Sequence, residues 1–140
     1  MIDLEPTIFA AHAAKFAEEA KAGPFRPVKV RAEYRGVSDD FPLCTIAEIE
    51  NTVYDRTRDS GSVENHAKLT FEVNAYSNHR TDKRGEARHI ITLSSNLMQG
   101  LGFTRTYCKP TPNPADPSVF RITARFEAVV DVETGDVYRR

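Results

Sequence analysis

The pattern of apolar and polar positions divides this chain into helical and extended segments. Near the N-terminus, apolar residues from Ile8 to Ala20 recur three to five positions apart, a spacing typical of an amphipathic helix. Pro6 suits the start of a helix, and Gly23-Pro24 suits its end, since glycine supplies a left-handed cap and proline does not continue the helix. The pattern therefore predicts a surface helix packed on a sheet.

A second helical stripe begins after Thr81 or Asp82, either of which can act as the N-cap. The stripe ends at Gly102, a natural stop. Burial of this face should stabilise the helix, because propensity alone leaves a helix of this length marginal. Its members are Ala87, Ile90, Ile91, Ser94, Leu97, Met98 and Leu101.

Alternation with period two predicts strands elsewhere. The alternation slips between Ile46 and Ile49, which predicts a bulge, and Val137-Tyr138 is placed to pair back on the last long strand. Prolines after residue 108 mark an exposed connection. The predicted strands are Pro27–Tyr34, Phe41–Tyr54, His66–Tyr76, Phe103–Cys108 and Phe120–Val132.

The resulting order is α-β-β-β-α-β-β. It indicates an α+β fold with a mainly antiparallel sheet flanked by two helices. A chain of 140 residues has the usual size of one domain, so we expect a single domain over residues 1–140.

Composition is ordinary for a globular protein: 40% hydrophobic, 28% charged and a formal net charge of −1. No general attraction to nucleic acid or to acidic membranes is expected. The N-terminus lacks the pattern of a signal peptide, and no apolar run is long enough to span a membrane. We expect a soluble protein made in a cytoplasm, with Cys44 and Cys108 as reduced, partly buried thiols.

No cluster of residues points to catalysis, a metal or a cofactor. The four histidines are scattered, and each is expected to be exposed or half-exposed. Glu86 and His89 are three positions apart on the second helix, which indicates a surface contact. Asp39-Asp40 lie in a loop, and Glu48 and Glu50 are expected on one face of a strand, in solvent. The histidines are His12, His66, His79 and His89.

Arginines are the one residue class that suggests an interaction. They gather in the polar 55–65 segment, around the start of the second helix beside Lys83, and near residue 140. Basic residues at a helix N-terminus are unfavourable for the helix dipole, which suggests an acidic partner or passing DNA, although a solvated face is the default interpretation. The candidate interaction residues are Arg56, Arg58, Arg80, Arg84, Arg88, Arg139 and Arg140.

Four segments together resemble a known family: Phe41–Thr52, Lys68–Asn78, Asn96–Thr106 and Arg121–Arg140. Their order and pattern are similar to those of the tail terminator, or tail completion, proteins of long-tailed bacteriophages, over about residues 25–140. The helix that runs into Leu101-Gly102-Phe103 and the final Val132–Arg140 segment carry most of the likeness.

The resemblance implies a structural virion protein without catalytic residues, cofactor or metal. It implies a homohexameric ring that caps the tail tube, ends tube polymerisation, meets the head-completion or connector protein, and lets DNA pass without sequence-specific binding. It also implies localisation in the tail or neck of the virion, after assembly in the host cytoplasm.

In such a ring, a neighbour could cover two long strands that we expect at the edges of the sheet, Lys68–Asn78 and Arg121–Val132. Two other hypotheses stay open: another neck or head-tail connector protein, and a small ligand-binding α+β domain or enzyme. For the third, His66, Glu72 and Arg125 would be the first residues to check.

Overall fold

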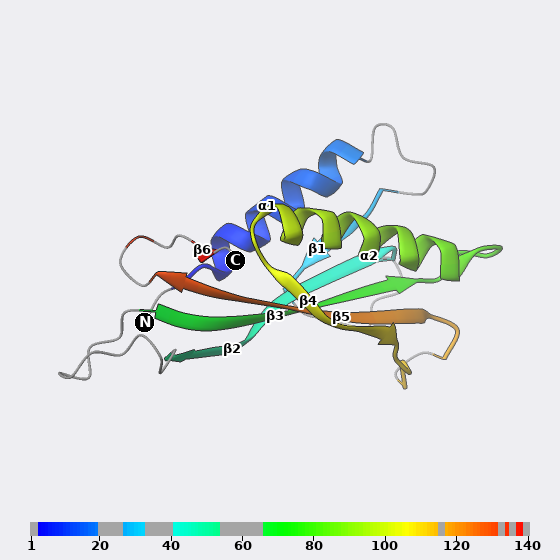
Figure 1. Cartoon of the computed structure of the whole chain (residues 1–140). Helices are drawn as coiled ribbons and strands as arrows, with labels where there is room; N and C mark the ends of the chain where they lie inside the picture. Colours follow the sequence, from blue (N-terminus) through cyan, green and yellow to red (C-terminus); the bar gives the residue numbers. More distant parts are fainter. Residues whose placement is uncertain are drawn as a thin grey trace.

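The structure is a computed structural model, and it describes residues 3–19, 27–32, 41–53, 66–114, 117–131, 134 and 137–138. Within these ranges the elements follow the predicted order α-β-β-β-α-β-β, and a short strand pairs back at the end, as expected for Val137-Tyr138 (Figure 1). The elements are α1 (Glu5–Glu19), β1 (Lys29–Arg31), β2 (Leu43–Val53), β3 (His66–Ser77), α2 (Lys83–Gly100), β4 (Thr104–Pro110), β5 (Phe120–Asp131) and β6 (Val137–Tyr138).

The strands form one sheet in the order β1-β2-β3-β5-β4, and β6 pairs with the last part of β5. Every pairing is antiparallel except β1 with β2, so the α+β prediction is confirmed. The expectation that the two longest strands lie at sheet edges is wrong. β3 is paired along both sides, and β5 lies between β3 and β4. The edges of the described sheet therefore belong to β4 on one side and, on the other, to β1 and the part of β2 after Thr45.

Both helices lie on one face of the sheet (Figure 1). α2 packs over β3 and β5, and α1 packs against β1, β2 and α2. The alternation of β3 points every second side chain at the helices, which explains why Leu69, Phe71 and Val73 are fully buried. The ring of Phe71 meets Phe103 edge-on, with centroids 5.6 Å apart.

The second helix ends where the sequence predicts. Asp82 is its N-cap, and its carboxylate accepts a hydrogen bond from the Gly85 amide. At the other end Gly102 has a φ of 94°, the left-handed conformation that glycine adopts without steric cost. The Gly102 amide donates to Gln99 and the Phe103 amide donates to Met98, which is the Schellman pattern of a helix C-terminus.

The predicted irregularity in β2 is a bulge between Glu48 and Glu50, which leaves Ile49 49% exposed. Glu48 pairs with Phe71, whereas Glu50 pairs with Thr70. Since neighbouring residues of a strand point to opposite faces, the bulge puts the two carboxylates on opposite faces of the sheet. The expectation that they share one face is therefore wrong.

His12 also differs from expectation. It is 0% exposed, whereas the other three histidines are half-buried. His12 is four residues after Ile8 and four before Phe16, both of which are buried, so it lies on the apolar stripe of α1. That spacing is the sequence signal for its burial.

None of the helices described is long and apolar enough to cross a membrane.

Candidate interaction surface

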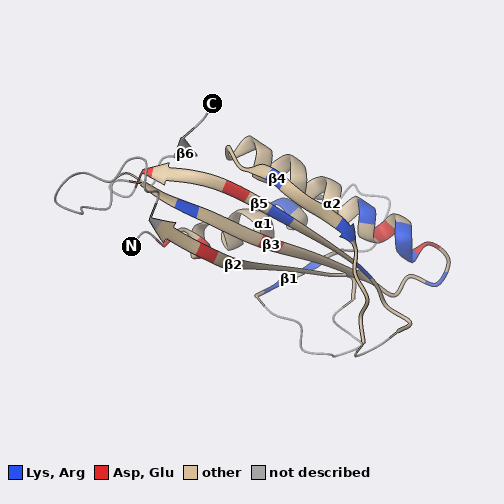
Figure 2. Ribbon diagram, turned by 60° about the horizontal axis from the view of Figure 1, so that its bottom comes forward, with Lys and Arg blue, Asp and Glu red and all other residues tan. Residues whose placement is uncertain are grey.

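The face of the sheet opposite the helices, called here the open face, carries polar and charged side chains. In the described part of the chain neither helix lies on it (Figure 2). Its residues alternate with the core residues of the same strands, and cross-strand pairing places them in rows. On β3 these residues are His66, Lys68, Thr70, Glu72, Asn74 and Tyr76.

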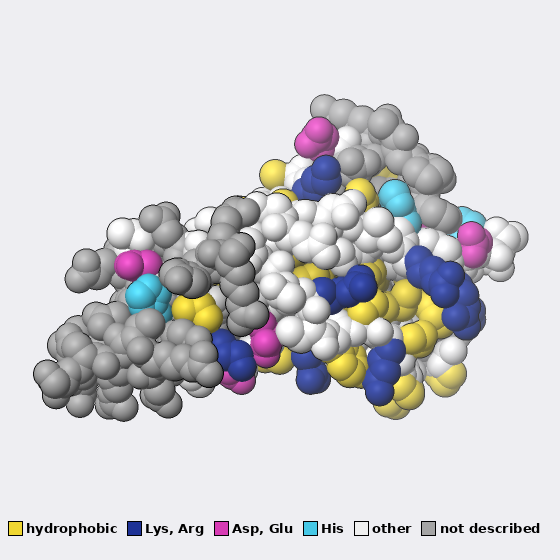
Figure 3. Space-filling model, viewed as in Figure 1, with side chains coloured by type: hydrophobic (Ala, Val, Ile, Leu, Met, Phe, Trp, Pro, Cys, Tyr) yellow, Lys and Arg dark blue, Asp and Glu magenta, His cyan; other side chains and the backbone are white. Residues whose placement is uncertain are grey.

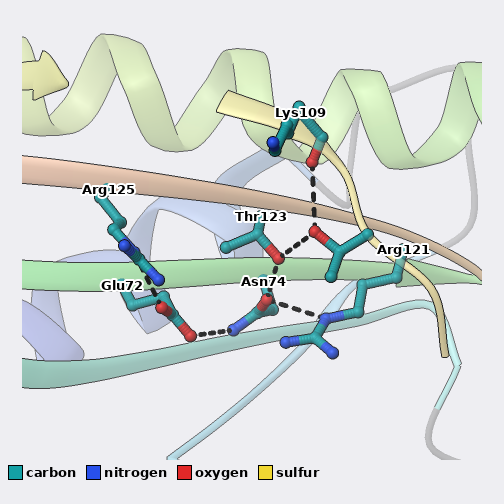
Figure 4. Close-up of polar contacts among 7 residues, drawn as sticks. Glu72, Asn74, Lys109, Arg121, Thr123 and Arg125 are labelled. Carbon is teal, nitrogen blue, oxygen red and sulfur yellow. Dashed lines mark hydrogen bonds and ion pairs between the residues drawn. The ribbon is translucent and has the colours of Figure 1, made fainter. Parts of the chain in front are cut away.

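Asn74 is the centre of a hydrogen-bond network on this face (Figure 4). Its Oδ1 accepts from Thr123 Oγ1 (2.6 Å) and from Arg121 Nε (3.0 Å), and its Nδ2 donates to Glu72 Oε1 (3.2 Å). Glu72 also accepts from Arg125 Nε at 3.1 Å. Asn74 is 6% exposed. Arg121 and Thr123, which donate to it, lie against this side chain and contribute to its burial.

Tyrosine rings hold the cationic side chains close to the sheet. Arg125 lies over the ring of Tyr107, 4.9 Å from its centroid, and Lys109 lies 5.3 Å from the same centroid. Arg121 lies over Tyr76 at 5.5 Å. These are cation–π contacts, and together with the Asn74 network they engage the charged side chains in the middle of the open face with one another.

The residues proposed for a ligand site do not converge. Glu72 and Arg125 are brought together by the register of β3 and β5. His66 is six positions away along β3, about 20 Å at strand spacing, and its Nε2 lies 4.0 Å from Asp131 Oδ2. The Glu72–Arg125 contact is a cross-strand ion pair on a surface.

The candidate arginines of α2 do form an exposed group. Arg80, Arg84 and Arg88 are all exposed near the start of the helix. Arg84 lies 4.9 Å from the centroid of the Phe120 ring, and Lys83 Nζ donates to the Ser118 carbonyl (3.3 Å). Figure 3 shows dark blue side chains gathered at this end of the molecule. The other four candidates, Arg56, Arg58, Arg139 and Arg140, lie outside the described residues.

Tertiary structure adds basic residues that sequence reasoning did not include. Lys109 is near the end of β4, and Arg121 is near the start of β5, and both strand ends lie beside the start of α2 (Figure 2). Lys29 and Arg31 on β1 pair with the first residues of β2 at the same end of the sheet. The connections between strands bring these strand ends together. The basic residues are far apart in the sequence, so the sequence alone does not indicate that they form one group.

One buried pair has the geometry of a serine–histidine dyad. His12 Nε2 lies 2.8 Å from Ser94 Oγ, and its Nδ1 lies 3.1 Å from the Ile8 carbonyl oxygen. Because that carbonyl only accepts, Nδ1 carries the proton, and Ser94 donates to Nε2. Both side chains are 0% exposed, so a substrate has no access, and the pair joins α1 to α2.

The remaining acidic candidates also have structural roles. Glu86 is 0% exposed and accepts from Ser77 Oγ at 2.7 Å. The expectation that Glu86 lies on the surface is therefore wrong, because α2 turns this carboxylate toward β3. Asp39-Asp40 lie outside the described residues. Across the described ranges, no three His, Cys, Asp or Glu side chains form a group that could hold a metal ion.

Both cysteines are free thiols, as expected. Cys44 is fully buried in the core, and burial raises the pKa of its thiol. Cys108, expected to be partly buried, is exposed because β4 is an outer strand.

β4 leaves the backbone of one sheet edge open. Within the described ranges it pairs only with β5, and six of its seven residues are exposed. Its sequence contains Arg105 and Lys109 and no acidic residue. Lysine and proline on an outer strand discourage uncontrolled edge-to-edge pairing. β4 ends in Lys109 and Pro110. The edge can still accept a specific partner that matches its charge.

Comparisons with protein-family models and with curated proteins find no match to this chain.

Proposed function

We propose that this chain is a structural subunit of a phage virion, a tail terminator that forms a ring on the end of the tail tube. The observation that carries the proposal is the exposed outer strand β4, whose open edge suits extension by another subunit. The resemblance of four segments to tail terminators supports the choice of this assembly, a ring on the tail tube. In this role the ring ends tube polymerisation and forms the surface that meets the head.

The polar surfaces support a structural role. On the open face, the Asn74 network and Arg125 are engaged in hydrogen bonds and cation–π contacts with neighbouring side chains. Ligand sites are concave and use a few convergent polar groups, whereas Glu72, Arg125 and His66 are spread along a strand face. The serine–histidine pair is sealed between the helices. These features favour an assembly protein over an enzyme, and no cofactor is part of the proposal.

The first test is the mass of the purified chain by multi-angle light scattering across a concentration series, with negative-stain images of each large species. A ring with a central hole is expected. The second test adds the ring to polymerising tail tube protein. A terminator should bind tube ends and stop elongation, and hydrogen exchange of residues 104–110 should slow where the β4 edge is covered.

Each outcome separates the hypotheses. A ring that binds the head connector but leaves tube growth unchanged would favour a neck protein instead of a terminator. A chain that stays monomeric with and without tube ends would contradict the ring, and the ligand-binding hypothesis would gain.

A further inference from the structure

The net charge of −1 hides two oppositely charged ends of the sheet. At one end, where β2 and β5 finish and β3 begins, carboxylates predominate (Figure 2). Among the residues described, Lys68 and Arg105 are the lysine and arginine of this end. Arg105 lies in the same row as Glu48, on the outer strand β4. The six carboxylates are Asp3, Glu5, Glu48, Glu50, Glu127 and Asp131.

Basic residues predominate at the opposite end, where α2 and β5 begin. The carboxylates described there are engaged locally, since Asp82 caps α2 and Glu86 is buried against Ser77. Four of the basic residues come from α2 and the turn before it, and four come from strands. They are Lys29, Arg31, Arg80, Lys83, Arg84, Arg88, Lys109 and Arg121.

The acidic end is not neutralised within the described chain. The Glu48 amide donates to the Glu5 carboxylate at 2.6 Å, which brings the two acids together. Desolvation raises the pKa of Glu48, and the charge of Glu5 raises it further. A cation beside this pair would lower the pKa of Glu48.

On the open face of the acidic end, one lysine ammonium group lies near two carboxylates. Lys68 Nζ lies 3.7 Å from Glu50 and 3.5 Å from Glu127. The Thr70 hydroxyl lies between the same two residues in the register, is buried, and has no hydrogen-bond partner among the residues described. This end therefore has negative charge to offer a partner.

The two ends are too far apart to compensate each other in one molecule. β3 has 12 residues, which corresponds to about 40 Å at strand spacing. The Debye length at physiological ionic strength is about 8 Å. Compensation therefore requires a second molecule.

We propose that the acidic end of one copy binds the basic end of the next copy, in a head-to-tail contact that repeats around the ring. This inference deepens the proposed function and rests on its ring. A head-to-tail contact is heterologous, and it closes into a ring when its rotation closes. A second copy is the partner that matches both ends at once, whereas a nucleic acid would match the basic end alone. Complementary charge contributes to steering and register more than to affinity.

The test uses two charge-reversal variants at exposed or half-exposed positions. Arg80→Glu with Arg88→Glu makes the basic end negative, and Asp3→Lys with Glu50→Lys makes the acidic end positive. In each variant alone, the two ends that would form the contact then carry charge of the same sign. The apparent dissociation constant of the oligomer, measured by analytical ultracentrifugation at 50 mM NaCl, should rise about 100-fold or more, because like charges across an interface cost several kcal/mol.

An equimolar mixture of the two variants should recover the oligomer, since copies then alternate with opposite ends in contact. Wild-type oligomer should dissociate in part at 500 mM NaCl. The matched control, Thr92→Glu with Asn96→Glu, adds negative charge at exposed positions on the same helix and should assemble normally. Circular dichroism verifies that all variants fold.

Three results would overturn the inference: wild type monomeric at low salt, oligomers unaffected by either reversal, or a mixture that fails to associate. Binding of the basic end to duplex DNA, abolished by Arg80→Glu with Arg88→Glu while oligomers persist, would assign that end to nucleic acid instead. A ring that assembles independently of these charges leaves the terminator proposal intact. Charge-dependent oligomers that never bind tube ends would refute the terminator role alone.

Discussion

Protonation of His12 should destabilise the protein at mildly acidic pH. The imidazole is fully buried between α1 and α2, and desolvation lowers its pKa from 6.5 to about 4, against a smaller opposing effect of the hydrogen bond to Ile8. The unfolded chain therefore binds a proton at a higher pH than the native chain does. The His12 contribution is complete above pH 6.5, falls as the pH drops from 6.5 towards 4, and changes little below that.

The size of the effect follows from the difference in pKa. One pKa unit corresponds to 1.36 kcal/mol, so a fall from 6.5 to about 4 costs about 3 kcal/mol when titration is complete. At pH 4.5 most of this, about 2–3 kcal/mol, should already be lost. That is a large part of the stability of a typical domain.

Urea unfolding at pH 7.5 and pH 4.5 measures the loss. The reference variant is His12→Leu with Ser94→Ala, which removes the titrating group and its partner together, a change that is often nearly neutral when both sides become apolar. Wild type should lose about 2–3 kcal/mol more than this variant between the two pH values. Ser94→Ala alone keeps the buried imidazole and should keep the pH dependence.

Equal losses in wild type and in the double variant would refute this reasoning. The titration of Glu48 does not affect the comparison between wild type and the double variant. The pKa of Glu48 is raised in the native state, so its contribution is present at low pH and is lost as the pH rises through the native pKa. Every variant retains Glu48, and its effect cancels in the difference.

Four further predictions concern the open face, the two ends of α2 and the thiols. Asn74→Ala should destabilise the protein by about 1–3 kcal/mol in urea unfolding, because the buried hydroxyl and the guanidinium that donate to it lose their acceptor; a change under 0.5 kcal/mol would contradict the network. Gly85→Ala should destabilise by about 1 kcal/mol, because the new Cβ would lie 2.6 Å from the Cγ of the carboxylate that caps α2. Gly100→Ala, which meets open space, should instead stabilise by about 0.4–1 kcal/mol. A disulfide reagent should modify Cys108 at once and Cys44 only after unfolding, and rapid modification of both thiols would contradict the burial of the second.

The local pattern of apolar and polar residues was sufficient to predict most of the secondary structure. The stripe of α2, its Asp82 cap and its end before Gly102 follow from residues close together in sequence. The alternation of β3 also predicted which of its side chains face the helices, but it did not predict the burial of Thr70, Asn74 and Tyr76 on the other face. Even the bulge beside Ile49 left a visible slip in the pattern. These features depend on helix and strand periods and on cap chemistry, which act over a few residues.

The interaction surface depended on contacts between distant residues. The cluster of arginines on α2 was visible in the sequence, but its continuation through Lys109 and Arg121 was not. The faces of Glu48 and Glu50 were assigned wrongly because a bulge reverses the alternation after it. Strand order likewise put the open edge at β4 and not at the longest strands.

By itself, the sequence determined the order of the helices and strands and both ends of α2, because hydrophobic period and cap residues act locally. The expected end of the first helix, Gly23-Pro24, lies outside the described residues. Only the tertiary structure decided that His12 meets Ser94, 82 residues away, and that charges from six elements gather at opposite ends of one sheet. The physical reason is that burial and cross-strand pairing are cooperative, so the partner of a side chain is set by the packing of the whole sheet and its helices.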